Sequence, residues 1–163
     1  MRNNNYSLVL KSSLSELSKL EQFVEKISDE YNIGHTYFSN IIVSLTELVK
    51  NAIIHGNNSN INKNVYLNFE QKEGKLRFAV TDEGNGFAEG IPNLYDESSY
   101  DNNKGNGLFI IKYLSDNIEF NNNGSQIIVD FNIASANELL SLTRINVFNK
   151  QGQKQEQKKT MHE

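Results

Sequence analysis

The chain has 163 residues and a formal net charge of −4, with three histidines and no cysteine. This length predicts a single domain with a sizeable core, and the lack of cysteine excludes disulfides and thiolate metal sites. The sequence has no basic stripe and no pair of histidines at ligand spacing, which argues against nucleic-acid binding and against a zinc site. Its first residues lack the apolar core of a signal peptide, and no run approaches about 18 apolar residues. We therefore expect a soluble cytoplasmic protein that binds neither nucleic acid nor membranes.

The first part of the chain predicts a strand followed by two helices. Residues 6–11 alternate as a strand does, and Ser13 and Glu16 then have the spacing of a capping box. Apolar residues follow at helical intervals as far as Tyr31. A second amphipathic helix is expected over residues 35–55, ending at Gly56, because glycine commonly terminates a helix.

The middle and end of the chain predict two hairpins separated by a loop and a helix. Strands are expected around residues 65–69 and 76–80, joined by a turn at residues 73–74. Residues 88–104 hold the only proline and little periodicity, which indicates a loop, and a short helix should follow over residues 107–114. A second hairpin should pair residues 117–120 with 126–133.

These elements indicate the fold class and the domain limits. Helices and strands mix without strict alternation, so we predict an α+β two-layer sandwich with helices on one face of a mostly antiparallel sheet. We expect one globular domain over residues 1–133. Residues 134–148 could form an accessory helix, either packed on the domain or docking a partner. Residues 149–163 contain almost no apolar residue and should be a disordered tail.

The second helix carries a polar face opposite its apolar stripe. Glu47 and Asn51 are four residues apart and share this face, with Ser44 and His55 beside them. The simplest interpretation is a solvated surface. The alternative is a ligand cleft, in which the carboxylate acts as a base and the amide oxygen coordinates a hard cation.

Two glycine-rich stretches follow. In "VTDEGNGF", Asp82 ends a strand and Gly84 and Gly86 come next, so this is either an Asx-capped turn or a place where a flat ligand lies on the backbone. In "NKGNGLFII", Gly105 and Gly107 precede a helix whose N-terminus favours an anion. This second stretch is neither a Walker loop nor the dinucleotide fingerprint.

In chain order these motifs resemble those of a known family. Glu47-x-x-x-Asn51, Asp82-x-Gly84-x-Gly86 and Gly105-x-Gly107 are similar to the N, G1 and G2 boxes of the GHKL (Bergerat-fold) ATPases, over about residues 6–133. The resemblance implies that Asp82 accepts the adenine amino group of ATP and that Gly84 and Gly86 let the base and ribose approach the backbone. Ser125 takes the place of the family's adenine-binding threonine.

The resemblance also assigns the phosphate end of the site. Asn51 would ligate the Mg²⁺ ion, Glu47 would act as the base, and residues 88–104 would form the ATP lid. The residues expected to hold the nucleotide where the lid meets the next helix are Lys104, Gly105, Gly107 and Leu108.

Within the family, the short chain, the phrase "NAIIHG" and a first helix without histidine look like the anti-sigma serine/threonine kinases of bacterial partner switching. The resemblance implies a homodimer that phosphorylates a small antagonist (anti-anti-sigma) protein and sequesters a sigma factor or similar regulator. Two alternatives stay open: an ATP-gated binding module without appreciable phosphotransfer, and a stand-alone histidine-kinase catalytic domain.

Overall fold

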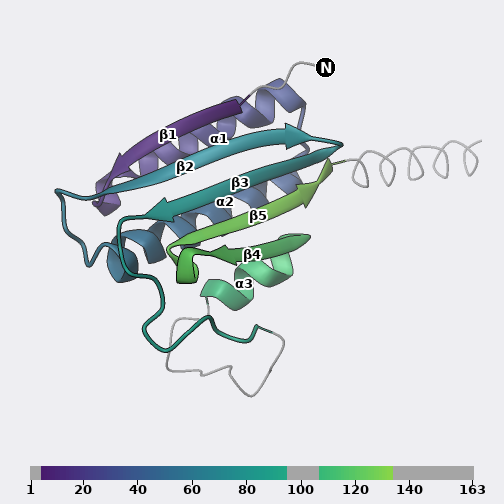
Figure 1. The fold of residues 1–163 in the computed structure, drawn as a ribbon. Coiled ribbons are helices and arrows are strands. Elements are labelled where there is room, and N and C mark those ends of the chain that lie inside the picture. The colour runs from purple at the N-terminus through teal and green to yellow at the C-terminus, as the bar shows by residue number, and fades with distance from the viewer. Residues whose placement is uncertain (1–4, 95–106, 134–163) are drawn as a thin grey trace, which may run out of the picture. The chain divides into compact units, whose positions relative to one another are not determined.

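The computed structural model describes residues 5–94 and 107–133, nearly all of which belong to one compact unit, Met1–Phe131. Five strands form one antiparallel sheet in the order β1-β2-β3-β5-β4 (Figure 1). The strands are β1 (Asn5–Lys11), β2 (Asn64–Lys72), β3 (Lys75–Asp82), β4 (Asn117–Asn121) and β5 (Gln126–Asn132). The helices are α1 (Leu17–Tyr31), α2 (His35–Asn51) and α3 (Gly107–Leu114), with short helical turns at η1 (Leu14–Glu16), η2 (Ala52–Gly56) and η4 (Asn122–Gly124).

All three helices lie on the same face of the sheet (Figure 1). β2 and β3 alternate between buried and more exposed positions, and their buried residues face the helices. The α+β two-layer sandwich predicted from the sequence is therefore confirmed. The core includes the fully buried side chains Leu10, Leu20, Val24, Ile41, Leu45, Val49, Val65, Leu67, Leu76, Phe78, Ile111, Val129 and Phe131.

Two tight hairpins set the strand register. Glu73 and Gly74 both have positive φ, 52° and 78°, as a type I′ turn requires, and Lys72 pairs with Lys75 across it. In the second hairpin Asn121 pairs with Gln126. The backbone N–H of Asp82, at the end of β3, donates to the carbonyl of Ser125, just before β5, at 2.9 Å. The end of β3 and the start of β5 therefore meet at one edge of the sheet.

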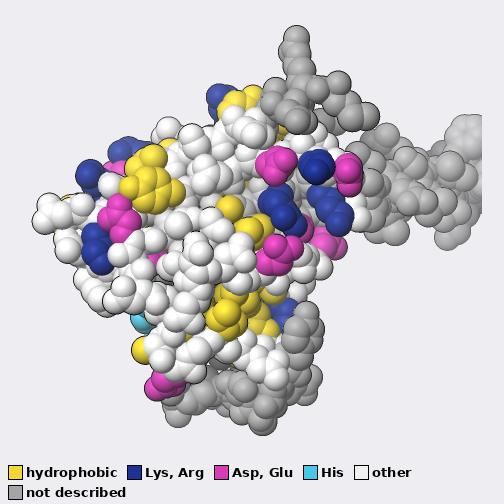
Figure 2. Space-filling model, viewed as in Figure 1, with side chains coloured by type: hydrophobic (Ala, Val, Ile, Leu, Met, Phe, Trp, Pro, Cys, Tyr) yellow, Lys and Arg dark blue, Asp and Glu magenta, His cyan; other side chains and the backbone are white. Residues whose placement is uncertain are grey.

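Among the described residues no helix covers the opposite face of the sheet, and this face is largely polar (Figure 2). Charged side chains gather there towards the β2–β3 turn. Arg77 donates to Asp130 at 2.7 and 2.8 Å and to Glu119 at 3.1 Å. Asp130 is only 3% exposed. Burial acts to raise the pKa of Asp130, but its hydrogen bonds from Arg77 and Asn117 hold the pKa below its usual range.

The helix starts and ends differ from the sequence-based expectation in two places. The capping box at Ser13 and Glu16 does not form: Ser13 Oγ accepts from the Ser15 N–H at 3.4 Å, while Glu16 accepts from the N–H of Lys11. The reason is that α1 begins with a 3-10 turn, which brings a nearer N–H to the serine. The second helix ends at Gly56 as expected, but its last turn, η2, is a π turn.

Several other expectations concern residues that the structure does not describe. Lys104, Gly105, most of the lid, the helix over 134–148 and the tail over 149–163 lie outside the described residues. Within residues 5–94 and 107–133, no helix combines the length and the apolar character needed to cross a bilayer.

Candidate functional site

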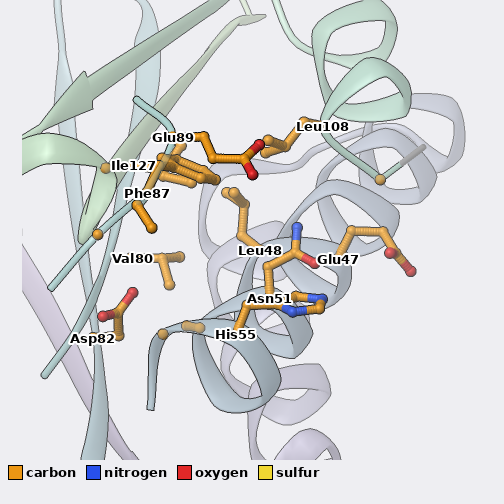
Figure 3. Close-up of a pocket in the computed structure, with 16 residues that line it drawn as sticks. Glu47, Leu48, Asn51, His55, Val80, Asp82, Phe87, Glu89, Leu108 and Ile127 are labelled. Carbon is orange, nitrogen blue, oxygen red and sulfur yellow. The ribbon is translucent and has the colours of Figure 1, made fainter. Parts of the chain in front are cut away.

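A cavity of about 670 Å³ opens beside α2, at the edge where β3 ends and β5 begins (Figure 3). Its volume lies within the range of small-molecule sites. Its lining comes from α2 and η2, the end of β3, the stretch that follows β3, the start of α3, η4 and the start of β5. The lining residues are Glu47, Leu48, Asn51, Ala52, His55, Gly56, Val80, Asp82, Gly86, Phe87, Ala88, Glu89, Gly107, Leu108, Gly124 and Ile127.

The polar face of α2 looks onto this cavity. Glu47 and Asn51 lie one turn apart beside it, and His55 follows on the π turn (Figure 3). Glu47 Oε1 accepts from Lys50 Nζ at 2.8 Å. The second carboxylate oxygen faces Gly107, where an added β-carbon would lie 3.0 Å from it. The first residue of α3 thus packs closely against the Glu47 carboxylate.

Ser44 does not share this position. The sequence places it beside Glu47 and Asn51, but the structure buries it completely and its Oγ makes no hydrogen bond with the described residues. It does not line the cavity. Ser44 does lie on the same side of the helix as Glu47, but at its position, one turn earlier, this side of α2 is buried.

Asp82 lies across the cavity from Asn51 (Figure 3). Its Oδ1 accepts from the N–H of Gly84 at 2.7 Å, which is the Asx turn that the sequence suggested. Burial raises the pKa of the Asp82 carboxyl, and this outweighs the lowering by the Gly84 hydrogen bond and the Lys63 charge. The turn and a ligand contact are compatible, because the same carboxylate also borders the cavity.

The two glycines after Asp82 are required by the chain's own backbone. A β-carbon at Gly84 would overlap the carbonyl of Gly56, and one at Gly86, where φ is +75°, would overlap the carbonyl of Asn123. Gly84 does not line the cavity, whereas Gly86 does. The sequence predicts that a ligand approaches the backbone at these glycines; the structure shows instead that η2 and η4 of the chain itself occupy the Cβ positions.

The remaining predicted residues are divided between the cavity and its surroundings. Gly107 and Leu108, at the start of α3, line the cavity. Ser125 does not: its Oγ donates to the Asn122 carbonyl at 3.0 Å, and its own carbonyl accepts from Asp82.

Several apolar residues at the cavity could not be singled out from the sequence. Val80, Phe87 and Ile127 gather on the same side as Asp82, with Leu48 facing them from α2 (Figure 3). Phe87 is held by its N–H to the Asn123 carbonyl at 2.9 Å and lies where a β-carbon on Gly124 would be. The sequence does not show that Phe87 belongs to the site, because this depends on the β4–β5 loop lying beside the end of β3.

This arrangement gives the cavity two chemically different ends. One end combines apolar walls with the Asp82 carboxylate, which suits a flat ring that carries a hydrogen-bond donor. The other end presents the Asn51 amide, the Glu47 carboxylate and the start of α3. A neutral amide oxygen is a normal ligand of hard cations such as Mg²⁺. No group of three or more His, Asp or Glu side chains gathers as a metal site within the described part of the chain.

Comparisons with known proteins agree with this architecture. A solved structure of the RsbU and RsbW domains of Rv1364c from Mycobacterium tuberculosis is similar to the chain, with a TM-score of 0.56 and 14% sequence identity. The similarity covers 78% of this chain and 31% of that chain, so the chain spans about a third of the solved protein. At this identity the match shows a common fold. No curated protein sequence matches the chain.

The sequence itself matches a family model. Residues 10–131 match the model described as the histidine kinase-like ATPase domain. This range runs from the end of β1 through α2, the Asp82 turn and α3 to the end of β5, and so includes every described element around the cavity. The chain belongs to the histidine kinase-like ATPase domain family.

Proposed function

We propose that the cavity binds ATP, with the adenine at the Asp82 end and the phosphates at the Asn51 end. The observation that carries this proposal is the placement of Asp82 and Asn51 on opposite sides of one cavity with apolar walls between them. The Asp82 carboxylate would accept the adenine amino group, while Val80, Phe87 and Ile127 would contact the ring. Family membership supports the choice of ATP over other flat ligands.

The phosphate end fits a Mg²⁺ ion. Asn51 would supply one oxygen ligand, and Mg²⁺ commonly binds through one or two protein oxygens together with phosphates. Bound there, the ion would neutralise phosphate charge. Gly107 opens α3 at this end of the cavity, and Gly105, outside the described residues, is the second glycine that we expect near the phosphates. Lys104 is proposed as a further phosphate contact.

We propose phosphotransfer to a Ser or Thr hydroxyl of a protein partner. Glu47 would accept the hydroxyl proton as the oxygen attacks the γ-phosphorus and the bond to the β-phosphate oxygen breaks. Lys50 holds one oxygen of Glu47 at 2.8 Å and so orients the carboxylate. The described geometry supports this role because the second oxygen lies at the start of α3, next to the expected phosphate site.

The proposed partners follow from the sequence resemblance to anti-sigma serine/threonine kinases. The substrate would be a small antagonist protein, and the regulator sequestered would be a sigma factor or a similar protein. We propose a homodimer and a cytoplasmic location on the same grounds.

Transfer of label tests the kinase step. The purified chain is incubated with γ-labelled ATP, Mg²⁺ and candidate antagonist proteins, and the labelled residue is identified by mass spectrometry. Label on a partner Ser or Thr is expected. ATP binding with no label on an antagonist that binds the chain would instead show an ATP-gated binding module, and label on histidine would show a histidine-kinase catalytic domain.

A further inference from the structure

A buried polar network lies behind the Asp82 turn and is not part of the cavity lining. At its centre is Asn57, the residue after η2, which is only 1% exposed. Its Nδ2 donates to Ser12 Oγ at 2.7 Å and to the Asn64 carbonyl at 2.8 Å. Its Oδ1 accepts from the backbone N–H of Glu83 at 2.8 Å. Asn57 therefore links the end of β1, the start of β2 and the Asp82 turn.

The partners of Asn57 fix the orientation of its amide. The Glu83 N–H can only donate and the Asn64 carbonyl can only accept, so Oδ1 and Nδ2 cannot be exchanged. Few side chains can donate two hydrogen bonds and accept one in this space. Aspartate would lose both donor bonds, and an apolar residue would take away the partner of the partly buried Glu83 N–H and of the partly buried Asn64 carbonyl.

Glu83, which stands between Asp82 and Gly84, is held at every polar group. Besides the N–H bond to Asn57, its carbonyl accepts from Lys63 Nζ at 2.9 Å. Its carboxylate accepts from the Tyr66 hydroxyl at 2.8 Å and from the Asn64 N–H at 3.3 Å. The hydrogen bond from Tyr66 is the main reason that the pKa of Glu83 is lowered. All of these partners belong to one stretch, residues 57–66.

This network acts on the carboxylate of Asp82 through the two neighbouring peptide groups. The Glu83 N–H anchors the peptide group directly after Asp82, and the Gly84 N–H holds Asp82 Oδ1 at 2.7 Å. Rotation of the turn would have to break the partly buried bond from the Glu83 N–H to Asn57 first. The carboxylate is thereby kept in one direction, towards the cavity.

We propose that Asn57 is a positioning residue that aims Asp82 at the amino group of the purine and so sets the preference for adenine. This inference rests on the proposed ATP binding. The predicted effect is on the choice of base. If the Asp82 carboxylate turns away, the hydrogen bond to the 6-amino group is lost while the contacts to the ring and the phosphates remain.

The test compares ATP with purine riboside triphosphate, which lacks the 6-amino group, by calorimetric titration in the presence of Mg²⁺. A charged hydrogen bond to the amino group corresponds to a wild-type preference for ATP of about 10-fold or more. In Asn57→Ala we expect the preference to fall to within about 3-fold, because ATP binds more weakly while the analogue is unaffected. Asn68→Ala, an exposed asparagine on β2, is the matched control and should keep the wild-type ratio.

A loss of fold stability alone would weaken both nucleotides equally and leave their ratio unchanged, so an unchanged ratio in Asn57→Ala overturns the inference. If Asn57→Ala shows no cooperative thermal transition, Tyr66→Phe decides in its place. That variant removes the hydroxyl that donates to the Glu83 carboxylate at 2.8 Å and accepts from Asn64 Nδ2 at 3.4 Å. We expect its ratio to fall at least about 2-fold; an unchanged ratio overturns the inference. Failure of the wild-type chain to bind ATP would instead overturn the proposed function, and this inference with it.

Discussion

Gly56 lies directly against the carboxylate of Asp82, so that a β-carbon at position 56 would overlap the carboxyl group. The contact joins the end of the second helix to the turn after β3, and it depends on the π turn that ends at Gly56. π turns within helices are often found at functional sites. The backbone at the end of η2 therefore packs directly against the Asp82 carboxylate, which joins the two sides of the proposed ATP site.

The first prediction concerns this contact. Gly56→Ala should displace the Asp82 carboxylate and lower ATP affinity by at least about 10-fold, since it removes a charged hydrogen bond to the ligand. Calorimetric titration of ATP measures the effect. Gly34→Ala is the matched control, because nothing lies within 4 Å of a β-carbon there. Equal affinities in the two variants would show that Asp82 does not need this packing.

The second prediction concerns the stability of the ligand-free chain. Burial raises the pKa of Asp82 in the folded state, so between the unfolded and folded pKa values the folded chain holds more proton and loses stability as the pH rises. At neutral pH Asp82 is ionised in both states, so the full destabilisation from burying its charge is present. Asp82→Asn should therefore raise the melting temperature of the ligand-free chain at pH 7 while weakening ATP binding.

The pH dependence separates this effect from general stabilisation. The gain in melting temperature should shrink as the pH is lowered towards about 3.9, the pKa of an unperturbed aspartate. A gain of the same size at every pH would contradict the electrostatic explanation, and a lowered melting temperature at pH 7 would contradict the sign.

The third prediction separates binding from phosphotransfer. Glu47→Ala should keep ATP affinity within about 3-fold and lower the rate of label transfer by about 10²–10⁴-fold, the usual contribution of a general base. The comparison variant is Glu25→Ala, which removes an exposed carboxylate from α1 and should leave the transfer rate as it is. Transfer at the wild-type rate in Glu47→Ala would exclude Glu47 as the base.

The fourth prediction concerns the open face of the sheet. Arg77→Ala leaves Asp130, which is 3% exposed, without its main partner and should lower the free energy of unfolding by about 1–3 kcal/mol. Because the pKa of Asp130 is lowered in the folded state, the stabilisation is present above the ordinary aspartate pKa and is lost as the pH falls through the lowered value.

Urea unfolding at pH 7 and in acid measures this difference. Lys72→Ala, an exposed cation on β2, should change the free energy of unfolding by under about 0.5 kcal/mol. ATP affinity should be the same in both variants, since neither residue lines the cavity. A neutral result for Arg77→Ala would mean that water replaces the guanidinium at Asp130.

The elements around the cavity could be predicted from the sequence because each is determined locally. The strands alternate with a period of two, and α3 begins at Gly107 and ends at Leu114, as the apolar pattern predicts. The turn at Glu73 and Gly74 joins its two strands at the expected place. These features depend on residues that are close in sequence.

The features that the sequence could not reveal depend on contacts between distant segments. The apolar stripe of α2 is the same whether its last turn is α or π, so the contact of Gly56 with Asp82 could not be predicted. Asn57 lies in a run of polar letters, "GNNSN", and only the folded chain shows that it is buried and bonded to Ser12 and Glu83. The glycine pattern after Asp82 suggested the approach of a flat ligand, whereas the backbone carbonyls of Gly56 and Asn123 are what lie against Gly84 and Gly86.

The most direct test of the account is calorimetric titration of ATP with Mg²⁺ into the wild-type chain and Asp82→Asn. We expect one ATP to bind per wild-type chain, and binding to the variant to be at least about 10-fold weaker. Equal affinity in the two proteins, or no binding by a wild-type chain that is shown to be folded, would contradict the placement of adenine at Asp82.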